Sequence, residues 1–76
     1  MTTKELFQTE TLTEREHEVL LMLSKGLVKK EIATQLGIGY STVDTHVSHI
    51  YKKLGVSNAP AAVSKAYQSG ILPSQK

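Results

Sequence analysis

The sequence predicts an all-α protein, a compact four-helix domain that contains a helix-turn-helix. A short amphipathic segment at residues 29–36 is followed by a Gly-Ile-Gly turn and by a longer amphipathic segment at 40–54. Apolar residues recur at three- and four-residue spacing, and a glycine follows each segment. With 76 residues and no cysteine, the chain has the size of one domain that helix packing, rather than disulfides, must hold together.

The first helix is expected at about residues 13–25. Thr13 is followed three residues later by Glu16, the pattern of a capping box that satisfies backbone N–H groups at a helix start. Glutamates crowd the first turns, where the helix dipole favours negative charge, and Gly26 marks the end. The apolar stripe of this helix comprises Val19, Leu20 and Leu23.

The second helix is expected at residues 29–36 and ends at Gly37. Its N-cap position falls on Val28, whose side chain has no hydrogen-bond acceptor, so this start is expected to fray. The inward residues of this helix are Ile32, Ala33 and Leu36.

The third helix is expected at residues 40–54, between Gly39, a tolerable N-cap, and Gly55. Three β-branched core residues lower its intrinsic helix propensity, so packing must stabilise it. They belong to a single apolar stripe at i, i+4, i+7 and i+11 that comprises Val43, Val47, Ile50 and Leu54.

The fourth helix is expected at residues 59–69, with Ser57 or Asn58 as its N-cap. Pro60 lies in the first turn, where its missing N–H does no harm, and Gly70 closes the helix. The apolar residues on this helix, or folding back after it, are Ala62, Val63, Ala66, Tyr67, Ile71 and Leu72.

Residues 12–72 are expected to form the folded domain. Residues 1–11 are polar and lack a sustained helical period, which predicts a tail or linker remnant with Phe7 as its apolar anchor. Residues 73–76 are expected to form a loose tail. The longest apolar run, 19–23, is far too short to span a bilayer, and no secretory signal is predicted, so we expect a cytoplasmic protein.

The net charge is only +2, but it is unevenly distributed along the chain. Residues 1–26 hold three basic and five acidic side chains, whereas residues 27–76 hold six basic and two acidic ones. The basic second part indicates a polyanionic partner. The alternative is a solvated surface whose charge bias has no function.

The polar face of the 40–54 helix is typical of DNA binding. Small hydroxyl side chains let a helix approach base edges in the major groove, and a threonine methyl can contact a thymine methyl. Lysines beside such a face can bind phosphates. The alternative is an ordinary solvated helix face. The candidate residues are Ser41, Asp44, Thr45, Ser48 and Lys52, with His49 at the border, Thr42 in the first turn, and Lys29, Lys30 and Lys53 flanking.

Other chemistries find little support in the sequence. His46 and His49 have a spacing that can chelate a metal, but no carboxylate or thiol is placed to complete the site, and His17 lies on another helix. The Gly-Ile-Gly turn joins two helices and is not a strand-to-helix phosphate cradle. No nucleophile is paired with a base, so we predict neither an enzyme nor a protein that binds a metal or cofactor.

Four blocks of sequence resemble the LuxR/NarL/GerE-type helix-turn-helix DNA-binding domain, the output domain of response regulators and related transcription factors. They are LTEREHEVL at 12–20, KEIATQLGI at 30–38, STVDTHVSHIYKKLGV at 41–56 and AAV at 61–63. The resemblance implies control of bacterial transcription, with residues 40–54 as the recognition helix on double-stranded DNA. It also implies a homodimer formed by the last helix, in which Val63 and Tyr67 meet their mates across a two-fold axis.

The resemblance also implies an N-terminal receiver or sensor domain or, less often, a small free-standing protein. RNA polymerase is a further expected partner. This chain departs from the family pattern at Asp44, commonly a lysine, and at Ser48, often basic or an amide. Ala59 stands where an arginine is usual, and Val28 and Gly39 stand where serine or threonine caps are usual. Asp44 has no lysine or arginine three or four residues away to neutralise it, so against phosphates its charge is expected to be repulsive. Alternatively, an aspartate can accept a hydrogen bond from a cytosine amino group and so specify a base. The alternative function is a protein-interaction module that keeps the fold with weakened DNA binding.

Overall fold

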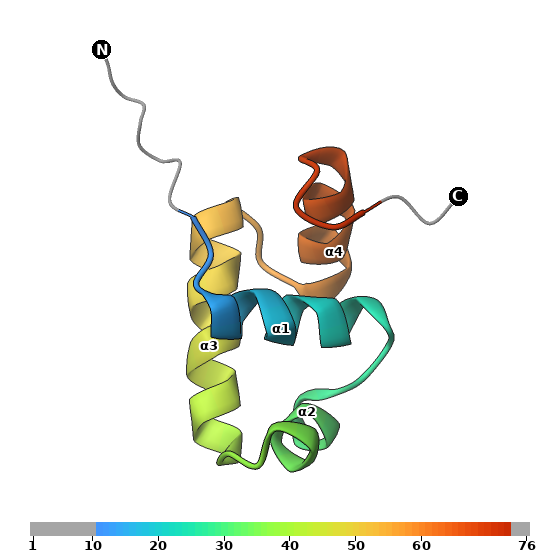
Figure 1. The fold of residues 1–76 in the computed structure, drawn as a ribbon. Coiled ribbons are helices and arrows are strands. Elements are labelled where there is room, and N and C mark those ends of the chain that lie inside the picture. Colours follow the sequence, from blue (N-terminus) through green and yellow to red (C-terminus); the bar gives the residue numbers. More distant parts are fainter. Residues whose placement is uncertain (1–10, 74–76) are drawn as a thin grey trace.

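The computed structural model describes residues 11–73, which form four helices and no strand. Helix α1 spans Glu14–Ser24, α2 spans Lys29–Leu36, α3 spans Tyr40–Leu54 and α4 spans Ala59–Gln68 (Figure 1). The predicted all-α class is confirmed, and every predicted helix boundary agrees with the observed one to within one residue. The predicted contact of Phe7 lies outside the described residues.

Helices α1 and α4 begin with the side-chain caps that the sequence predicts. Thr13 Oγ1 accepts the Glu16 N–H at 3.1 Å, and Glu16 Oε1 accepts the Thr13 N–H at 3.0 Å, which completes a capping box. Asn58 Oδ1 accepts the Ala61 N–H at 2.8 Å. These caps fix where the chain enters the two helices, both of which pack against α3.

Helix α2 has no side-chain cap at Val28, as predicted, but its start is not bare. Glu31 Oε1 accepts the Val28 N–H at 2.9 Å, and the Ile32 N–H donates to the Val28 carbonyl at 3.0 Å. The prediction of a fraying start overlooked this bond from Glu31.

Two glycines shape the helix-turn-helix and its exit. Gly37 ends α2 with φ 68° and Gly55 ends α3 with φ 70°, both in the left-handed region that side chains disfavour. Gly39, which precedes α3, has an ordinary extended φ of −74°. The turn between α2 and α3 therefore depends on Gly37 and not on Gly39.

Helix α3 is the central element, because it packs against α1, α2 and α4. In Figure 1, α1 crosses α3, with α2 on one side of the crossing and α4 on the other. The buried hydrophobic core draws on all four helices and on the segment after α4, and it comprises Val19, Leu20, Ile32, Ala33, Val43, Val47, Ile50, Ala62, Ala66 and Leu72. No helix within residues 11–73 is long and apolar enough to cross a membrane.

Some predicted core residues lie at the edge of the core. Leu23, Leu36 and Leu54 are only partly buried and pack against the core from outside, because each belongs to the last turn of its helix. The predicted return of the chain after α4 is confirmed: Leu72 is 1% exposed, and its N–H donates to the Ala66 carbonyl at 3.2 Å.

Candidate nucleic-acid interface

One side of α3 carries an exposed polar surface, which we call the outward face. The opposite side of the helix is fixed in the core by Val43, Val47 and Ile50, each at most 1% exposed. The predicted candidates on α3 other than Lys53 therefore point away from the core together. The exposed members are Ser41, Thr42, Asp44, Thr45, Ser48, His49 and Lys52.

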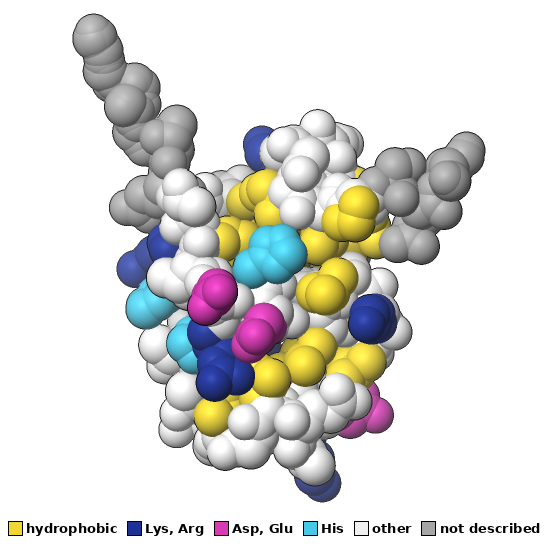
Figure 2. Space-filling model, viewed as in Figure 1, with side chains coloured by type: hydrophobic (Ala, Val, Ile, Leu, Met, Phe, Trp, Pro, Cys, Tyr) yellow, Lys and Arg dark blue, Asp and Glu magenta, His cyan; other side chains and the backbone are white. Residues whose placement is uncertain are grey.

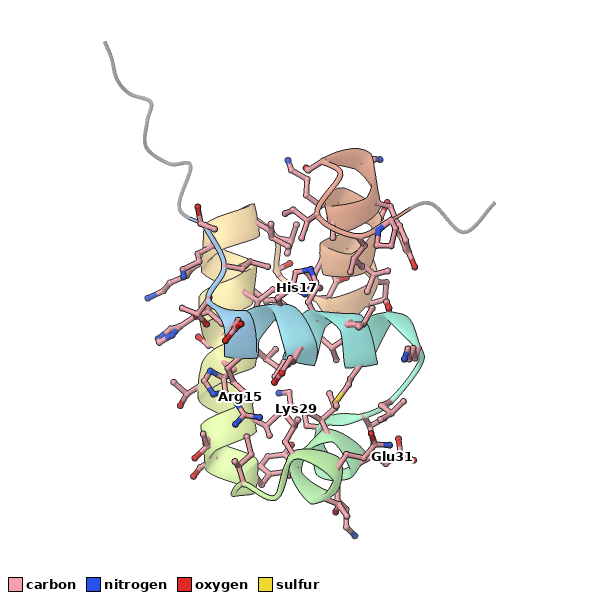
Figure 3. All side chains as sticks on the ribbon, in the orientation of Figure 1. Arg15, His17, Lys29 and Glu31 are labelled. Carbon is pink, nitrogen blue, oxygen red and sulfur yellow. The ribbon has the colours of Figure 1, made fainter. Side chains whose placement is uncertain are left out.

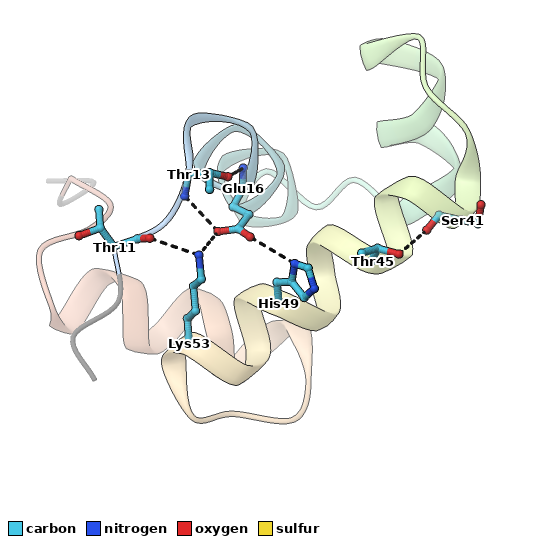
Figure 4. Close-up of polar contacts among 7 residues, drawn as sticks. All are labelled: Thr11, Thr13, Glu16, Ser41, Thr45, His49 and Lys53. Atoms are coloured by element: carbon cyan, nitrogen blue, oxygen red, sulfur yellow. Dashed lines mark hydrogen bonds and ion pairs between the residues drawn. The ribbon is translucent and has the colours of Figure 1, made fainter. Parts of the chain in front are cut away.

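The hydroxyl of Thr45 is partly committed within the outward face. Thr45 Oγ1 donates to the Ser41 carbonyl at 3.0 Å, one turn earlier (Figure 4). This bond uses the hydroxyl proton, while the oxygen lone pairs and the methyl group stay available. Thr45 can thus accept a hydrogen bond from a ligand or contact an apolar group.

Asp44 forms an ion pair across the helix-turn-helix. Lys29 Nζ, reaching from α2 (Figure 3), lies 2.5 Å from Asp44 Oδ1 in the second turn of α3. The hydrogen bond to Asp44 holds the pKa of Lys29 above its ordinary value. The side chains are 34% and 56% exposed, so such a pair contributes only about 0.2–1 kcal/mol to folding. Lys29 and Asp44 can therefore each exchange this contact for another partner at little cost in folding stability.

The Lys29–Asp44 pair lines an open groove between α2, α3 and the turn after α3. The groove has a volume of about 320 Å³ and is also lined by Ser48, Tyr51 and Lys52. Two lysines, one aspartate, a serine and a tyrosine therefore lie around one depression. The lysines can bind phosphate oxygens, and the carboxylate can accept a bond from a donor.

The start of α2 adds an apolar component beside Lys30, which is exposed as predicted. Val28 is 61% exposed and Tyr40 is 56% exposed, and both line a groove with Lys29 and Lys30. The sequence-based prediction missed these two residues. The signal was present, because both are large apolar residues that fall at helix starts and outside the inward stripes.

Lys53 belongs to the contact between α1 and α3. Its Nζ donates to Glu16 Oε1 at 2.7 Å and to the Thr11 carbonyl at 3.2 Å, and its side chain is 17% exposed (Figure 4). His49 Nδ1 lies 3.6 Å from Glu16 Oε2. This placement argues against the predicted phosphate contact of Lys53, because Glu16 already holds its ammonium group.

Glu16 is the buried acidic residue of the described chain, at 3% exposure. Burial acts to raise the pKa of its carboxyl, but the hydrogen bonds from Lys53 and the Thr13 N–H, with the nearby charges of Lys53 and His49, hold that pKa below its ordinary value. Glu16 is therefore ionised at neutral pH and links α1 to α3. The capping-box pattern predicted the bonds between Glu16 and Thr13, whereas no spacing in the sequence predicted the bond between Glu16 and Lys53.

The face that α1 presents is not a basic surface. In Figure 2, basic, acidic, histidine and hydrophobic side chains are interspersed on it. Arg15 Nη1 pairs with Glu18 Oε1 at 3.3 Å, and His17 Nε2 lies 3.3 Å from the Ile71 carbonyl. The lysines around the outward face of α3 are therefore the better candidates for a polyanion.

The two predicted dimer residues lie on α4. Val63 and Tyr67 are half-buried, one helical turn apart, at the edge of the core. Val63 also lines a groove with Leu23, Leu27 and Pro60 at the junction of α1 and α4. Apolar surface thus remains accessible on the side of α4 that carries both residues.

Residues 10–66 match the model of the family described as bacterial regulatory proteins, luxR family. The chain belongs to the luxR family. The match covers α1, α2, α3 and most of α4, so it includes the helix-turn-helix and its outward face. The resemblance that the sequence motifs indicate is confirmed.

Several luxR-family relatives show how far the similarity extends. The chain is 46% identical over 63 residues to the response regulator protein VraR of Staphylococcus aureus, which covers 83% of this chain and 30% of VraR. The crystal structure of the response regulator ChrA of a heme-sensing two-component system matches with a TM-score of 0.80 and 43% identity, over 83% of this chain and 31% of ChrA. The transcription factor GerE matches with a TM-score of 0.75 and 35% identity, over 84% of this chain and 97% of GerE. The chain thus spans less than a third of these response regulators but nearly all of GerE.

Proposed function

We propose that this luxR-family domain binds double-stranded DNA in the control of bacterial transcription, with the outward face of α3 in the major groove. The observation that carries the proposal is the pairing of two opposite faces on α3: a fully buried stripe and an exposed row of short polar side chains. A helix held this firmly by its neighbours can enter a groove as a rigid unit.

The residues divide by role according to their placement. Ser41, Thr45 and Ser48 are short enough to reach base edges and form the base-reading set. Lys30 and Lys52, with Thr42 in the first turn, form the phosphate-binding set, and Lys29 can join it when it leaves Asp44. His49 lies at the border of the outward face, beside Glu16. Lys53 helps to position α3 through its ion pair with Glu16 of α1.

Three outward lysines cannot neutralise many phosphates, so tight binding needs more than one domain. We expect a homodimer through α4, with Val63 and Tyr67 at a two-fold axis, on half-sites about one helical turn apart. The relatives VraR and ChrA are response regulators, so the proposal includes a receiver or sensor domain as a partner, a cytoplasmic setting, and RNA polymerase as a further contact.

The proposal is tested by selecting bound sites from a random duplex library at one fixed salt concentration. We expect one sequence pattern to be enriched by the wild-type chain. Ser48→Ala should lower that enrichment several-fold, whereas Ser69→Ala, at an exposed serine just after α4, should not. Retention of no duplex, or retention without any preferred sequence, would contradict sequence-specific DNA binding.

A further inference from the structure

We propose that Asp44 determines DNA sequence specificity by competing with phosphate for the ammonium group of Lys29. The inference rests on the proposed function and adds to it a residue that works against binding on most sequences. It also names the base that relieves this effect, a cytosine facing Asp44.

The geometry gives Lys29 two competing acceptors. Lys29 and Asp44 lie on different helices, with Lys29 Nζ 2.5 Å from Asp44 Oδ1 in the groove beside Ser48 and Lys52. DNA that covers the outward face of α3 must also cover this groove. A phosphate oxygen that approaches Lys29 therefore competes with a carboxylate that is already bound.

On an arbitrary duplex the competition weakens binding. If Lys29 stays with Asp44, one of the three outward lysines is lost to phosphate neutralisation. If Lys29 turns to phosphate, Asp44 is left as an unpaired negative charge against a polyanion. Either arrangement lowers the affinity for DNA regardless of its sequence.

A cytosine at the right position removes the conflict. The amino group of cytosine is a hydrogen-bond donor in the major groove, and a carboxylate is its matching acceptor. Asp44 is 56% exposed, so its oxygens are accessible to such a base edge. With Asp44 bonded to the cytosine, Lys29 is free to bind phosphate, and both charges keep a partner.

The test is a double-mutant cycle on the full chain with the wild type, Asp44→Ala, Lys29→Gln and the double variant. Binding to an unrelated duplex is measured at several salt concentrations. We expect Asp44→Ala to tighten this binding by about two- to fivefold and to steepen the slope of log K against log salt by about 0.9. In the Lys29→Gln background, where Asp44 has no lysine to release, Asp44→Ala should steepen the slope by clearly less.

The same proteins are then measured on the selected site and on that site with the cytosine facing Asp44 replaced by thymine. The replacement should weaken the wild type by roughly 5- to 100-fold and Asp44→Ala by less than about twofold. Glu18→Gln is the matched control, because it removes one negative charge, as Asp44→Ala does, but on α1. It should alter neither the salt slope nor the effect of replacing the cytosine. Thermal melts should show all variants folded, since both members of the pair are partly exposed.

The outcomes separate the two proposals. If the wild type selects a site but the effects of Asp44→Ala and Lys29→Gln are additive, the proposed competition for Lys29 is wrong. The proposed DNA-binding function is then still supported. A selected site that lacks cytosine opposite Asp44 likewise overturns this inference alone. If the wild type retains no duplex at any salt concentration, the proposed function fails, and the inference fails with it.

Discussion

At the scale of single residues, Glu16 does more than cap a helix. One carboxylate oxygen accepts bonds from the Thr13 N–H and from Lys53, and the other faces His49 on α3. Glu16 is only 3% exposed, so water cannot readily replace it as the acceptor for these groups. The residue therefore couples the start of α1 to the orientation of α3.

We expect the free energy of unfolding to fall as the pH drops through the folded-state pKa of Glu16. That pKa lies below the ordinary value of 4.5, so its stabilisation is fully present above this value and is lost on acidification. Glu16→Gln should flatten this acid dependence and cost about 2 kcal/mol at neutral pH. Denaturant melts across a pH series measure both effects.

The control for this prediction is Glu18→Gln, because Glu18 is 54% exposed and pairs with Arg15 at the surface. It should keep the wild-type acid dependence. An acid dependence that persists unchanged in Glu16→Gln would show that other groups control it.

Burial along α3 predicts an order of core substitutions. Ile50 is fully buried, so Ile50→Ala should cost about 2–4 kcal/mol. Leu54 is only partly buried at the end of the helix, so Leu54→Ala should cost less, about 1–2 kcal/mol. Urea melts of the two variants compare them directly, and a larger loss for Leu54→Ala would mean that the end of α3 is packed more tightly than described.

The buried stripe of α3 could be predicted because side-chain direction follows the helical period. The ion pairs Lys53–Glu16 and Lys29–Asp44 could not be predicted. Lys53 and Glu16 are 37 positions apart, and Lys29 and Asp44 are 15 positions apart. Whether such residues meet depends on the angles at which helices dock, which no local pattern specifies.

At the scale of elements, the helix boundaries were predictable because their causes are local. Thr13 and Asn58 cap helices through bonds to residues three positions away, and Gly37 and Gly55 end helices through their own backbone conformation. The start of α2 was predicted less well: the Val28 side chain makes no cap, but the Glu31 carboxylate accepts the backbone N–H of Val28. The sequence-based prediction considered only the N-cap side chain and did not include this bond to the third residue of the helix.

The uncapped start of α3 offers a stabilising substitution. Gly39→Ser should raise the free energy of unfolding by about 0.5–1 kcal/mol, because serine restricts the unfolded chain and its hydroxyl can cap α3. Gly39 has φ −74°, and an added Cβ would approach only Thr42 Oγ1, at 3.9 Å. Denaturant melts measure the gain.

Gly37→Ser is the matched control at the other end of the turn. It should destabilise the domain, because a side chain at φ 68° is strained even where space is open. If both serine variants changed the stability in the same direction, the distinction drawn between these two glycines would be wrong.

At the scale of the whole molecule, the small number of outward lysines limits DNA affinity. With Lys53 engaged inside the fold, Lys29, Lys30 and Lys52 remain around the outward face. A single domain should therefore show a slope of log K against log salt of roughly −2 to −3. Mobility shifts on a duplex with one half-site measure this slope, and a value that implies ten or more contacts would contradict it.

Contact between the outward face of α3 and DNA can be observed residue by residue, by following amide NMR shifts as a duplex with one half-site is added. We predict the largest changes from Ser41 to Lys52 in α3 and at Lys29 and Lys30 in α2, with little change around Val63. Changes centred on α4, with α3 unaffected, would contradict this contact and favour a protein-interaction module on the same fold.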